Sequence, residues 1–126
     1  MLTITSRDNP QIKHVRALLS GSRARREAGL FVCEGFTLLG EALRRGCTPR
    51  AVFCLEGEEH RLPPLTCPTC LVTRPVLEKL SDVPAPQGVV FTLPLPPLEE
   101  ALPEGERFLA LDQLRDPGNV GTVLRT

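Results

Sequence analysis

Residues 30–55 read LFVCEGFTLLGEALRRGCTPRAVFCL, and their apolar residues follow two different periods. A short apolar run over 30–33 is followed by apolar residues at helical spacing over 36–43, and Gly46 closes that segment. A second short apolar run follows over 50–55. This order predicts a strand, a helix and a second strand, which is typical of an α/β layered domain with a largely parallel sheet.

The same alternation continues on both sides of this stretch. Upstream, Asn9 is a favoured N-cap residue and Pro10 suits a first helical turn, so we expect a helix to begin there. The other predicted elements are a short helix over 22–28, strands over 70–73 and 88–93, and a short helix over 75–80. Together they predict an α/β fold.

Proline and acidic residues are concentrated over 94–105, which read PLPPLEEALPEG. This composition is typical of a semi-rigid linker. Beyond it, residues 107–112 form a continuous apolar run, as expected for a strand buried on both faces. We therefore expect an N-terminal helical basic extension over 1–29, an α/β domain over 30–94, a Pro-rich linker over 95–105 and the incomplete start of another domain over 106–126.

The charges are unevenly distributed, although the net charge is zero. Residues 1–50 carry nine basic and four acidic side chains, and residues 51–126 carry six and eleven. Such asymmetry indicates an electrostatic footprint for an anionic partner, with a solvated helix face as the alternative. The candidate nucleic-acid-binding residues gather near the N-terminus: Arg7, Asn9, Lys13, Arg23, Arg25 and Arg26. Because the chain has no Trp or Tyr, phosphate contacts are favoured over base stacking on aromatic side chains.

The composition is that of a globular protein, since 41% of the 126 residues are hydrophobic and 24% are charged. These values exclude wholesale disorder and fibrous repeats. No apolar run approaches the roughly 20 residues that span a bilayer, and the N-terminus has no basic-then-apolar signal pattern. We therefore expect a cytoplasmic protein with no membrane partner.

Five cysteines, an odd number, do not indicate a disulfide framework. Cys67 and Cys70 form a lone CxxC, with Cys54 and His60 nearby in the sequence. Structural zinc sites usually combine two tight pairs of ligands. We therefore favour ordinary thiols, and no metal, over zinc or redox chemistry.

Residues 111–126 read LDQLRDPGNVGTVLRT and form the most informative motif. Gly118 and Gly121 would let the backbone approach a ligand closely, and Asn119 could cap a helix or fix its loop. The start of a helix presents N–H groups that suit a phosphate, and Arg125 could add a charge-assisted contact. The residues alone leave open whether this is an anion site or a turn whose glycines serve only its geometry.

This motif resembles the first signature motif of the SpoU/TrmH-type RNA 2′-O-ribose methyltransferases of the SPOUT superfamily. The N-terminal part is similar to the substrate-binding domain of that family. The segments that carry this similarity are Ser6-Arg7-x-Asn9-Pro10-x-Ile12-Lys13, Arg23-x-x-Arg26-x-x-Gly29-x-Phe31-x-x-Glu34-Gly35, Glu41-Ala42-Leu43 and Pro86-Gln87-Gly88-Val89.

The resemblance implies a three-layer α/β/α sandwich of the ribosomal-protein-like type that grips RNA, followed by the truncated start of a knotted α/β domain. In the family, the knotted domain dimerises and binds S-adenosylmethionine, so the full-length protein is expected to be a homodimer that methylates rRNA or tRNA. Asn119 and Arg125 would then lie at the catalytic centre. Because a guanidinium is a poor base, Arg125 is expected to orient the phosphate and stabilise the developing alkoxide.

The second and third motifs of the family, which form the knot and hold the cofactor, are not found in these 126 residues. We therefore expect a fragment without cofactor-binding residues that is inactive alone. Two alternatives remain open: a non-catalytic RNA-binding module of ribosomal-protein-like fold, and a protein–protein interaction fragment with a solvated basic surface. The first motif argues against the non-catalytic RNA-binding module. The salt dependence of RNA binding would separate that module from the protein–protein interaction fragment.

Overall fold

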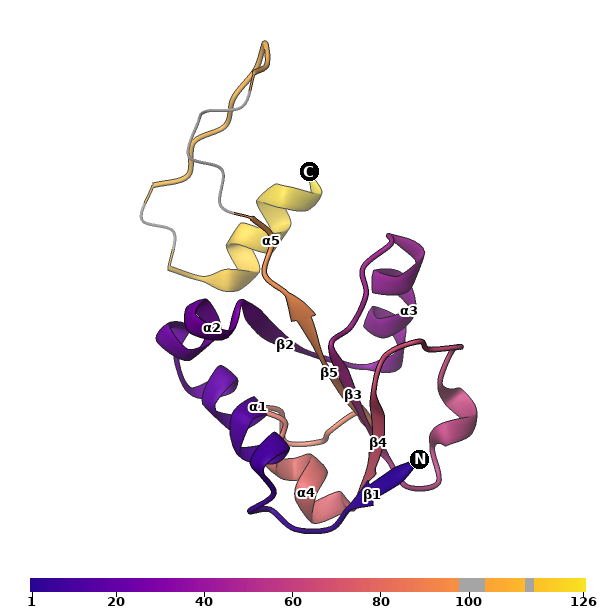
Figure 1. The fold of residues 1–126 in the computed structure, drawn as a ribbon. Coiled ribbons are helices and arrows are strands. Elements are labelled where there is room, and N and C mark those ends of the chain that lie inside the picture. The colour runs from indigo at the N-terminus through magenta and orange to yellow at the C-terminus, as the bar shows by residue number, and fades with distance from the viewer. Residues whose placement is uncertain (98–103, 113–114) are drawn as a thin grey trace. The chain divides into compact units, whose positions relative to one another are not determined.

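A computed structural model describes residues 1–97, 104–112 and 115–126 (Figure 1). The chain divides into two compact units, Met1–Pro96 and Pro97–Thr126. Among the described residues, no helix is long and apolar enough to cross a membrane.

The first unit is built on a five-stranded sheet in the order β1-β4-β3-β5-β2. The strands are β1 (Leu2–Ile4), β2 (Leu30–Glu34), β3 (Ala51–Leu55), β4 (Thr69–Val72) and β5 (Val89–Pro94). β4 pairs in parallel with β1 and β3, whereas β5 pairs antiparallel with β3 and β2. The sheet is therefore mixed, and the expectation of a largely parallel sheet is wrong for β5.

The register of β5 against β3 shows at which end of the sheet β5 begins. Helix α4 (Arg74–Lys79) starts directly after β4 and has six residues, so it rises only about 9 Å. The nine residues after α4 lead to Val89, which pairs with Cys54 near the end of β3. β5 therefore starts at the end of the sheet where β3 and β4 finish, and it runs against both strands.

The other helices of the first unit are α1 (Pro10–Ser20), α2 (Ser22–Ala28), α3 (Phe36–Arg44) and a 3-10 turn (Glu59–Arg61). The predicted start of α1 is confirmed, because the Asn9 side chain accepts a hydrogen bond of 2.8 Å from the backbone N–H of Gln11. The bounds of α2 also agree with the predicted helix over 22–28.

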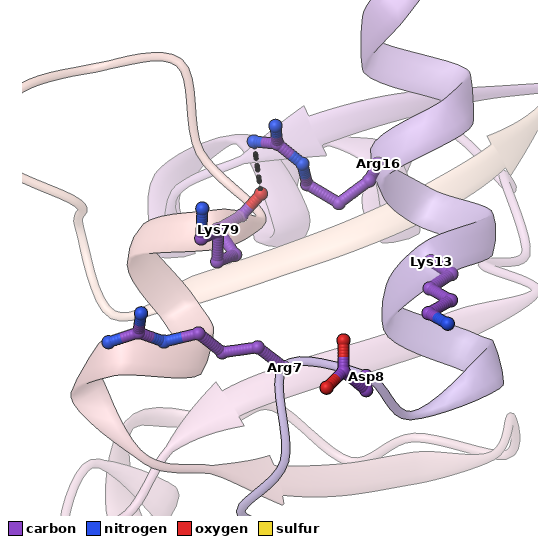
Figure 2. Close-up of a pocket in the computed structure, with 5 residues that line it drawn as sticks. All are labelled: Arg7, Asp8, Lys13, Arg16 and Lys79. Carbon is purple, nitrogen blue, oxygen red and sulfur yellow. Dashed lines mark hydrogen bonds between the residues drawn. The ribbon is translucent and has the colours of Figure 1, made fainter.

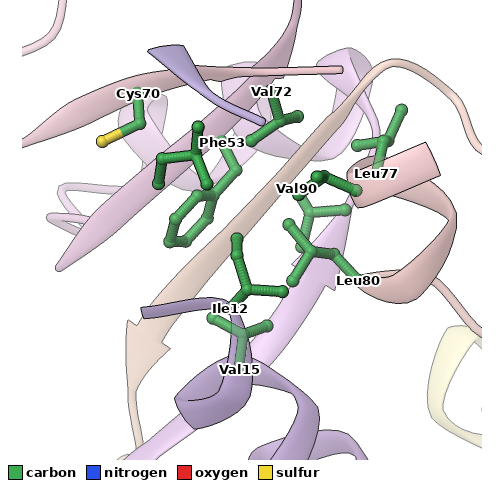
Figure 3. Packing of buried hydrophobic residues seen from close by; sticks show 10 residues of the cluster. Ile12, Val15, Phe53, Cys70, Val72, Leu77, Leu80 and Val90 are labelled. Carbon is green, nitrogen blue, oxygen red and sulfur yellow. The ribbon is translucent and has the colours of Figure 1, made fainter. Parts of the chain in front are cut away.

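Helices cover both faces of the sheet, because side chains along each strand alternate between the faces. The face under α1 and α4 is packed with side chains from both helices and from the middle strands. These include Ile12, Val15, Phe53, Val72, Leu77, Leu80 and Val90 (Figure 3). Residues adjacent to them in β3 and β5 point to the other face and pack against α3; these strand residues include Val52, Val89 and Phe91. They contact Leu39 and Ala42 of α3.

Residues 1–29 belong to this same unit, so the expected separate N-terminal extension is corrected. β1 adds an edge strand to the sheet, and α1 buries Ile12, Val15 and Leu18 in the domain. The sequence pattern missed β1 because it is three residues long and Leu2 is 66% exposed. A strand this short shows no recognisable alternation.

The second unit contains helix α5 (Pro117–Arg125). The strand expected over 107–112 is not formed, and Phe108 and Leu109 are 65% and 74% exposed. A strand needs neighbours for its backbone hydrogen bonds, and no strand occurs among the described residues 104–112 and 115–126. Of the predicted linker over 95–105, residues 98–103 lie outside the described part of the chain, as do 113 and 114 of the motif.

Two adjacent leucines of α3 test this packing. Leu39 is fully buried against the sheet, whereas Leu38 is 47% exposed. We expect Leu39→Ala to lower the free energy of unfolding by roughly 2–5 kcal/mol, and Leu38→Ala to change it by about 0.5 kcal/mol or less. Urea denaturation followed by circular dichroism measures both values. Equal losses would contradict the placement of α3.

Candidate nucleic-acid interface

A groove of about 400 Å³ lies between α1 and α4 in the first unit. We call it the basic groove; its lining residues are Arg7, Asp8, Lys13, Arg16 and Lys79 (Figure 2). All five are exposed to solvent. Four cations face one carboxylate, so the groove carries a net positive charge in a chain whose net charge is zero.

The spacing along α1 places two of these cations on one side of the helix. Lys13 and Arg16 are three residues apart, and side chains at this spacing are neighbours on a helix surface. The positions directly before them, Ile12 and Val15, contribute their side chains to the core. The amphipathic pattern that buries α1 therefore also directs Lys13 and Arg16 outward.

The remaining groove residues come from the turn before α1 and from α4. In the turn, the Ser6 hydroxyl accepts a 3.1 Å hydrogen bond from the backbone N–H of Asp8, and this contact shapes the loop that carries Arg7. Across the groove, the Arg16 guanidinium donates a 3.1 Å hydrogen bond to the backbone carbonyl of Lys79 (Figure 2). This bond links α1 to α4 and uses one of the five N–H groups of the guanidinium.

The chemistry of the groove suits phosphate groups. Arg and Lys provide positive charge and several N–H donors, which contact phosphate oxygens without reading base sequence. No aromatic side chain lines the groove. A nucleic acid would therefore be held here by its backbone, with an affinity that falls as salt rises.

The predicted RNA-binding residues are only partly brought together. Arg7 and Lys13 line the basic groove, whereas Asn9 caps α1 through its side chain. Arg16 and Lys79 were not among the predicted residues. The spacing of three between Lys13 and Arg16 could have indicated Arg16, but only the fold places Lys79 opposite them.

The arginines of α2 have partners within the protein. Arg23 forms a 2.9 Å ion pair with Glu27, and Arg26 lies 3.5 Å from the Ser22 hydroxyl. Arg25 is half-buried and donates a 2.7 Å hydrogen bond to the carbonyl of Leu18, which ties α2 to the end of α1. We therefore assign Arg25 a structural role.

Asn119 and Arg125, the predicted catalytic residues, both lie in α5 and are exposed. Asp116, rather than Asn119, caps this helix: its carboxylate accepts a 2.8 Å hydrogen bond from the backbone N–H of Gly118. The expectation that Asn119 could act as the cap is therefore wrong. The side chain of Asn119 projects from the first turn of the helix.

The cysteines lie in different environments. Cys54 is buried, Cys67 is half-buried, and the Cys70 thiol lies 3.8 Å from the Gln11 side-chain oxygen. Among residues 1–97, 104–112 and 115–126, no group of three His, Cys, Asp or Glu side chains could hold a metal ion.

Residues 9–90 match the family of MRM3-like substrate binding domains. The chain belongs to this family. The matched range runs from the N-cap of α1 into β5, and it includes Lys13, Arg16 and Lys79 of the basic groove.

The relatives of this MRM3-like domain are named as RNA methyltransferases. The chain is 35% identical to an uncharacterized tRNA/rRNA methyltransferase of Synechocystis, over 98% of the chain and 48% of that protein. A crystal structure of an RNA 2′-O ribose methyltransferase superposes with a TM-score of 0.76 and 31% identity, over 98% of the chain and 50% of that structure.

An AdoMet-bound rRNA methyltransferase from Sinorhizobium meliloti gives a TM-score of 0.75 and 30% identity, over 98% of the chain and 49% of that structure. The chain therefore spans about half the length of these relatives.

Thiol reactivity tests the burial of Cys54 in the MRM3-like domain. Burial, with smaller contributions from Glu59 and Glu58, raises the pKa of the Cys54 thiol to about 11, whereas Cys47 is exposed. Because the thiolate is the reactive form, about 0.1% of Cys54 would be reactive at pH 8. We expect Cys47 to react with a disulfide reagent first and Cys54 last.

The rate for Cys54 should rise about tenfold for each pH unit below its pKa, because the thiolate fraction rises in that proportion. Cys47→Ser should remove the fast phase, and Cys54→Ala the slow phase. A fast phase that persists in Cys47→Ser and disappears in Cys54→Ala would contradict this assignment.

Proposed function

We propose that this MRM3-like domain holds RNA for a ribose 2′-O-methyltransferase, with rRNA or tRNA as the substrate class. The observation that carries the proposal is the basic groove, where four cations converge on a domain whose relatives are named as RNA methyltransferases. Phosphate contacts in the groove would fix the orientation of the RNA. The identity of the target nucleotide would be decided elsewhere on the enzyme.

The division of the chain into two units supports separate parts for RNA binding and catalysis. The first unit has helices on both faces of its sheet, in keeping with a three-layer α/β/α sandwich of the ribosomal-protein-like type. We assign the second unit, which begins at Pro97, to the start of a knotted catalytic domain. The resemblance implies that the whole enzyme is a cytoplasmic homodimer.

The methyl donor of the proposed enzyme is S-adenosylmethionine, the ligand named for the Sinorhizobium meliloti relative. A site for a molecule of this size encloses most of its surface. In the second unit, α5 instead presents Asn119 and Arg125 on an exposed surface. The described residues of this unit therefore do not fit the cofactor by themselves, and we expect the isolated chain to be inactive.

Within the whole enzyme, we assign Arg125 to the target ribose and its phosphate. Its guanidinium is exposed at the end of α5, where it could donate to phosphate oxygens and stabilise negative charge on the ribose oxygen. Asn119 precedes it on the same helix and is assigned to the same centre.

Removal of one positive charge from the basic groove tests the first part of the proposal. We expect Lys13→Gln to weaken binding of a stem–loop RNA to the 126-residue chain. The slope of log affinity against log salt should become shallower by about 0.7–0.9, because one phosphate contact is lost. Fluorescence anisotropy at a series of salt concentrations measures both changes.

Arg44→Gln is the matched control, because Arg44 lies on α3 and pairs with Glu41 at 2.7 Å on the opposite face of the sheet. It removes the same charge without touching the basic groove. If the wild-type chain binds RNA independently of salt, or if both variants weaken binding equally, the groove is not the RNA interface.

Substitution of Arg125 tests the catalytic assignment in the whole enzyme. We expect Arg125→Ala to lower methyl transfer roughly 100- to 1,000-fold, because a donor to the developing charge is removed. Binding of S-adenosylmethionine, measured by calorimetry, should change little. Arg115→Ala is the control, since Arg115 is exposed in the same unit but precedes α5. A retained rate in Arg125→Ala would refute the assignment.

A further inference from the structure

A second hollow of the first unit, of about 380 Å³, lies where β3 and β4 finish. We call it the β3–β4 pocket. Its polar lining comes from three connections of the sheet: Glu58 and Arg61 after β3, Arg74 after β4, and Gln87 before β5. The proposed function does not use these residues.

Arg61 forms a rigid planar surface in this pocket. Its guanidinium carbon lies 4.0 Å from the centroid of the Phe36 ring, and its Nη1 donates a 2.9 Å hydrogen bond to Oε2 of Glu58. The two contacts hold the guanidinium over the Phe36 ring. Since the Arg61 side chain is still 49% exposed, the face away from Phe36 is open to a ligand.

The backbone around Phe36 is built for this arrangement. Gly88 has a φ of +94°, and a Cβ atom there would lie 3.1 Å from Cε2 of the Phe36 ring. Gly35 has a φ of +106°, and a Cβ atom there would lie 2.6 Å from the Gln87 side-chain oxygen. Side chains at either position would crowd Phe36 or Gln87, so the glycines leave the room that these two residues occupy.

Glu34 fixes the loop that forms the far wall of the pocket. Its carboxylate accepts a 2.7 Å hydrogen bond from the Ser81 hydroxyl and a 3.0 Å hydrogen bond from the backbone N–H of Gln87. The segments Glu34-Gly35 and Pro86-Gln87-Gly88 are thus parts of one structure. They hold Phe36, and through it Arg61, in place.

The pocket has a net positive charge. Arg74 joins Arg61 there, and Glu58 is the acidic residue of the lining. The hydrogen bond from Arg61, with smaller contributions from the charges of Arg61, His60 and Arg74, holds the pKa of the Glu58 carboxyl below its ordinary value. Glu58 therefore stays ionised and keeps Arg61 oriented, while Arg74 supplies the uncompensated charge.

The β3–β4 pocket and the basic groove open at the same end of the sheet. β1, β4 and β3 are parallel neighbours, so the connections that follow them leave from one edge (Figure 1). Arg7 follows β1, Arg74 follows β4 and Arg61 follows β3. Because neighbouring strands are about 4.8 Å apart, an extended RNA segment can reach across these connections.

We propose that the β3–β4 pocket receives one unpaired nucleotide of the RNA substrate, with its base stacked on the exposed face of Arg61 and its phosphate at Arg74. This inference rests on the proposed function. A planar guanidinium is a known stacking surface for splayed-out RNA bases. In a chain without Trp or Tyr, Phe36 supports the stacking surface from below instead of contacting the base.

Arg61→Lys tests this proposal, because it keeps the charge and removes the planar group. The probes are a stem–loop RNA with 2-aminopurine in its loop and a blunt duplex with the sequence of its stem. We expect the wild-type 126-residue chain to prefer the stem–loop and to change the fluorescence of its 2-aminopurine. Arg61→Lys should lose roughly fivefold or more in affinity for the stem–loop, with unchanged affinity for the duplex and an unchanged salt slope.

Arg44→Lys is the matched control, since Arg44 is also an exposed arginine paired with a glutamate three residues before it. It should leave both affinities and the fluorescence change as in the wild type. Arg74→Gln should weaken binding of the stem–loop more than that of the duplex. Thermal melting of each variant verifies that the fold is intact.

The outcomes separate the two proposals. If Arg61→Lys binds the stem–loop with the affinity and fluorescence change of the wild type, the pocket does not hold an unpaired base. The same holds if the wild type does not distinguish stem–loop from duplex, although the basic groove can still bind RNA. If the wild type binds neither RNA, the proposed function itself is overturned. Polyglutamate tests whether the pocket binds an acidic peptide instead. If polyglutamate displaces the stem–loop from the wild type but not from Arg61→Lys, the stacking proposal is overturned in favour of an acidic peptide.

Discussion

Burial of β3 and β5 on both faces is the constraint on which the rest of the first unit depends. Val52 and Phe53 are adjacent in sequence, yet they enter opposite cores because side chains alternate along a strand. Helices must therefore cover both faces, α1 and α4 on one and α3 on the other. That requirement brings α1 beside α4 and so forms the basic groove between them.

The same sheet also determines where polar chemistry gathers. Three parallel strands finish side by side, and the connections after them carry Arg7, Arg74 and Arg61. A chain of zero net charge thereby concentrates cations at one end of its sheet. Other arginines serve the fold, as when Arg25 bonds to the carbonyl of Leu18. The number of arginines therefore says less about RNA binding than their places in the fold.

Much of the first unit could be predicted from local patterns. The N-cap at Asn9, the bounds of α2 and four of the five strands follow from caps, glycines and apolar spacing. β1 could not be predicted, because a strand of three residues that includes one exposed leucine shows no alternation of buried and exposed residues. The strand over 107–112 was predicted from its apolar run, but the described residues around it offer no strand to pair with.

By itself, the sequence determined the local elements, the concentration of positive charge before residue 50 and the motifs that mark the family, because each depends on residues close together in the chain. The tertiary structure alone decided the antiparallel course of β5, the position of Lys79 opposite Arg16, and the stacking of Arg61 on Phe36. These features join residues 25 or more positions apart, and only packing around a shared sheet fixes such pairs.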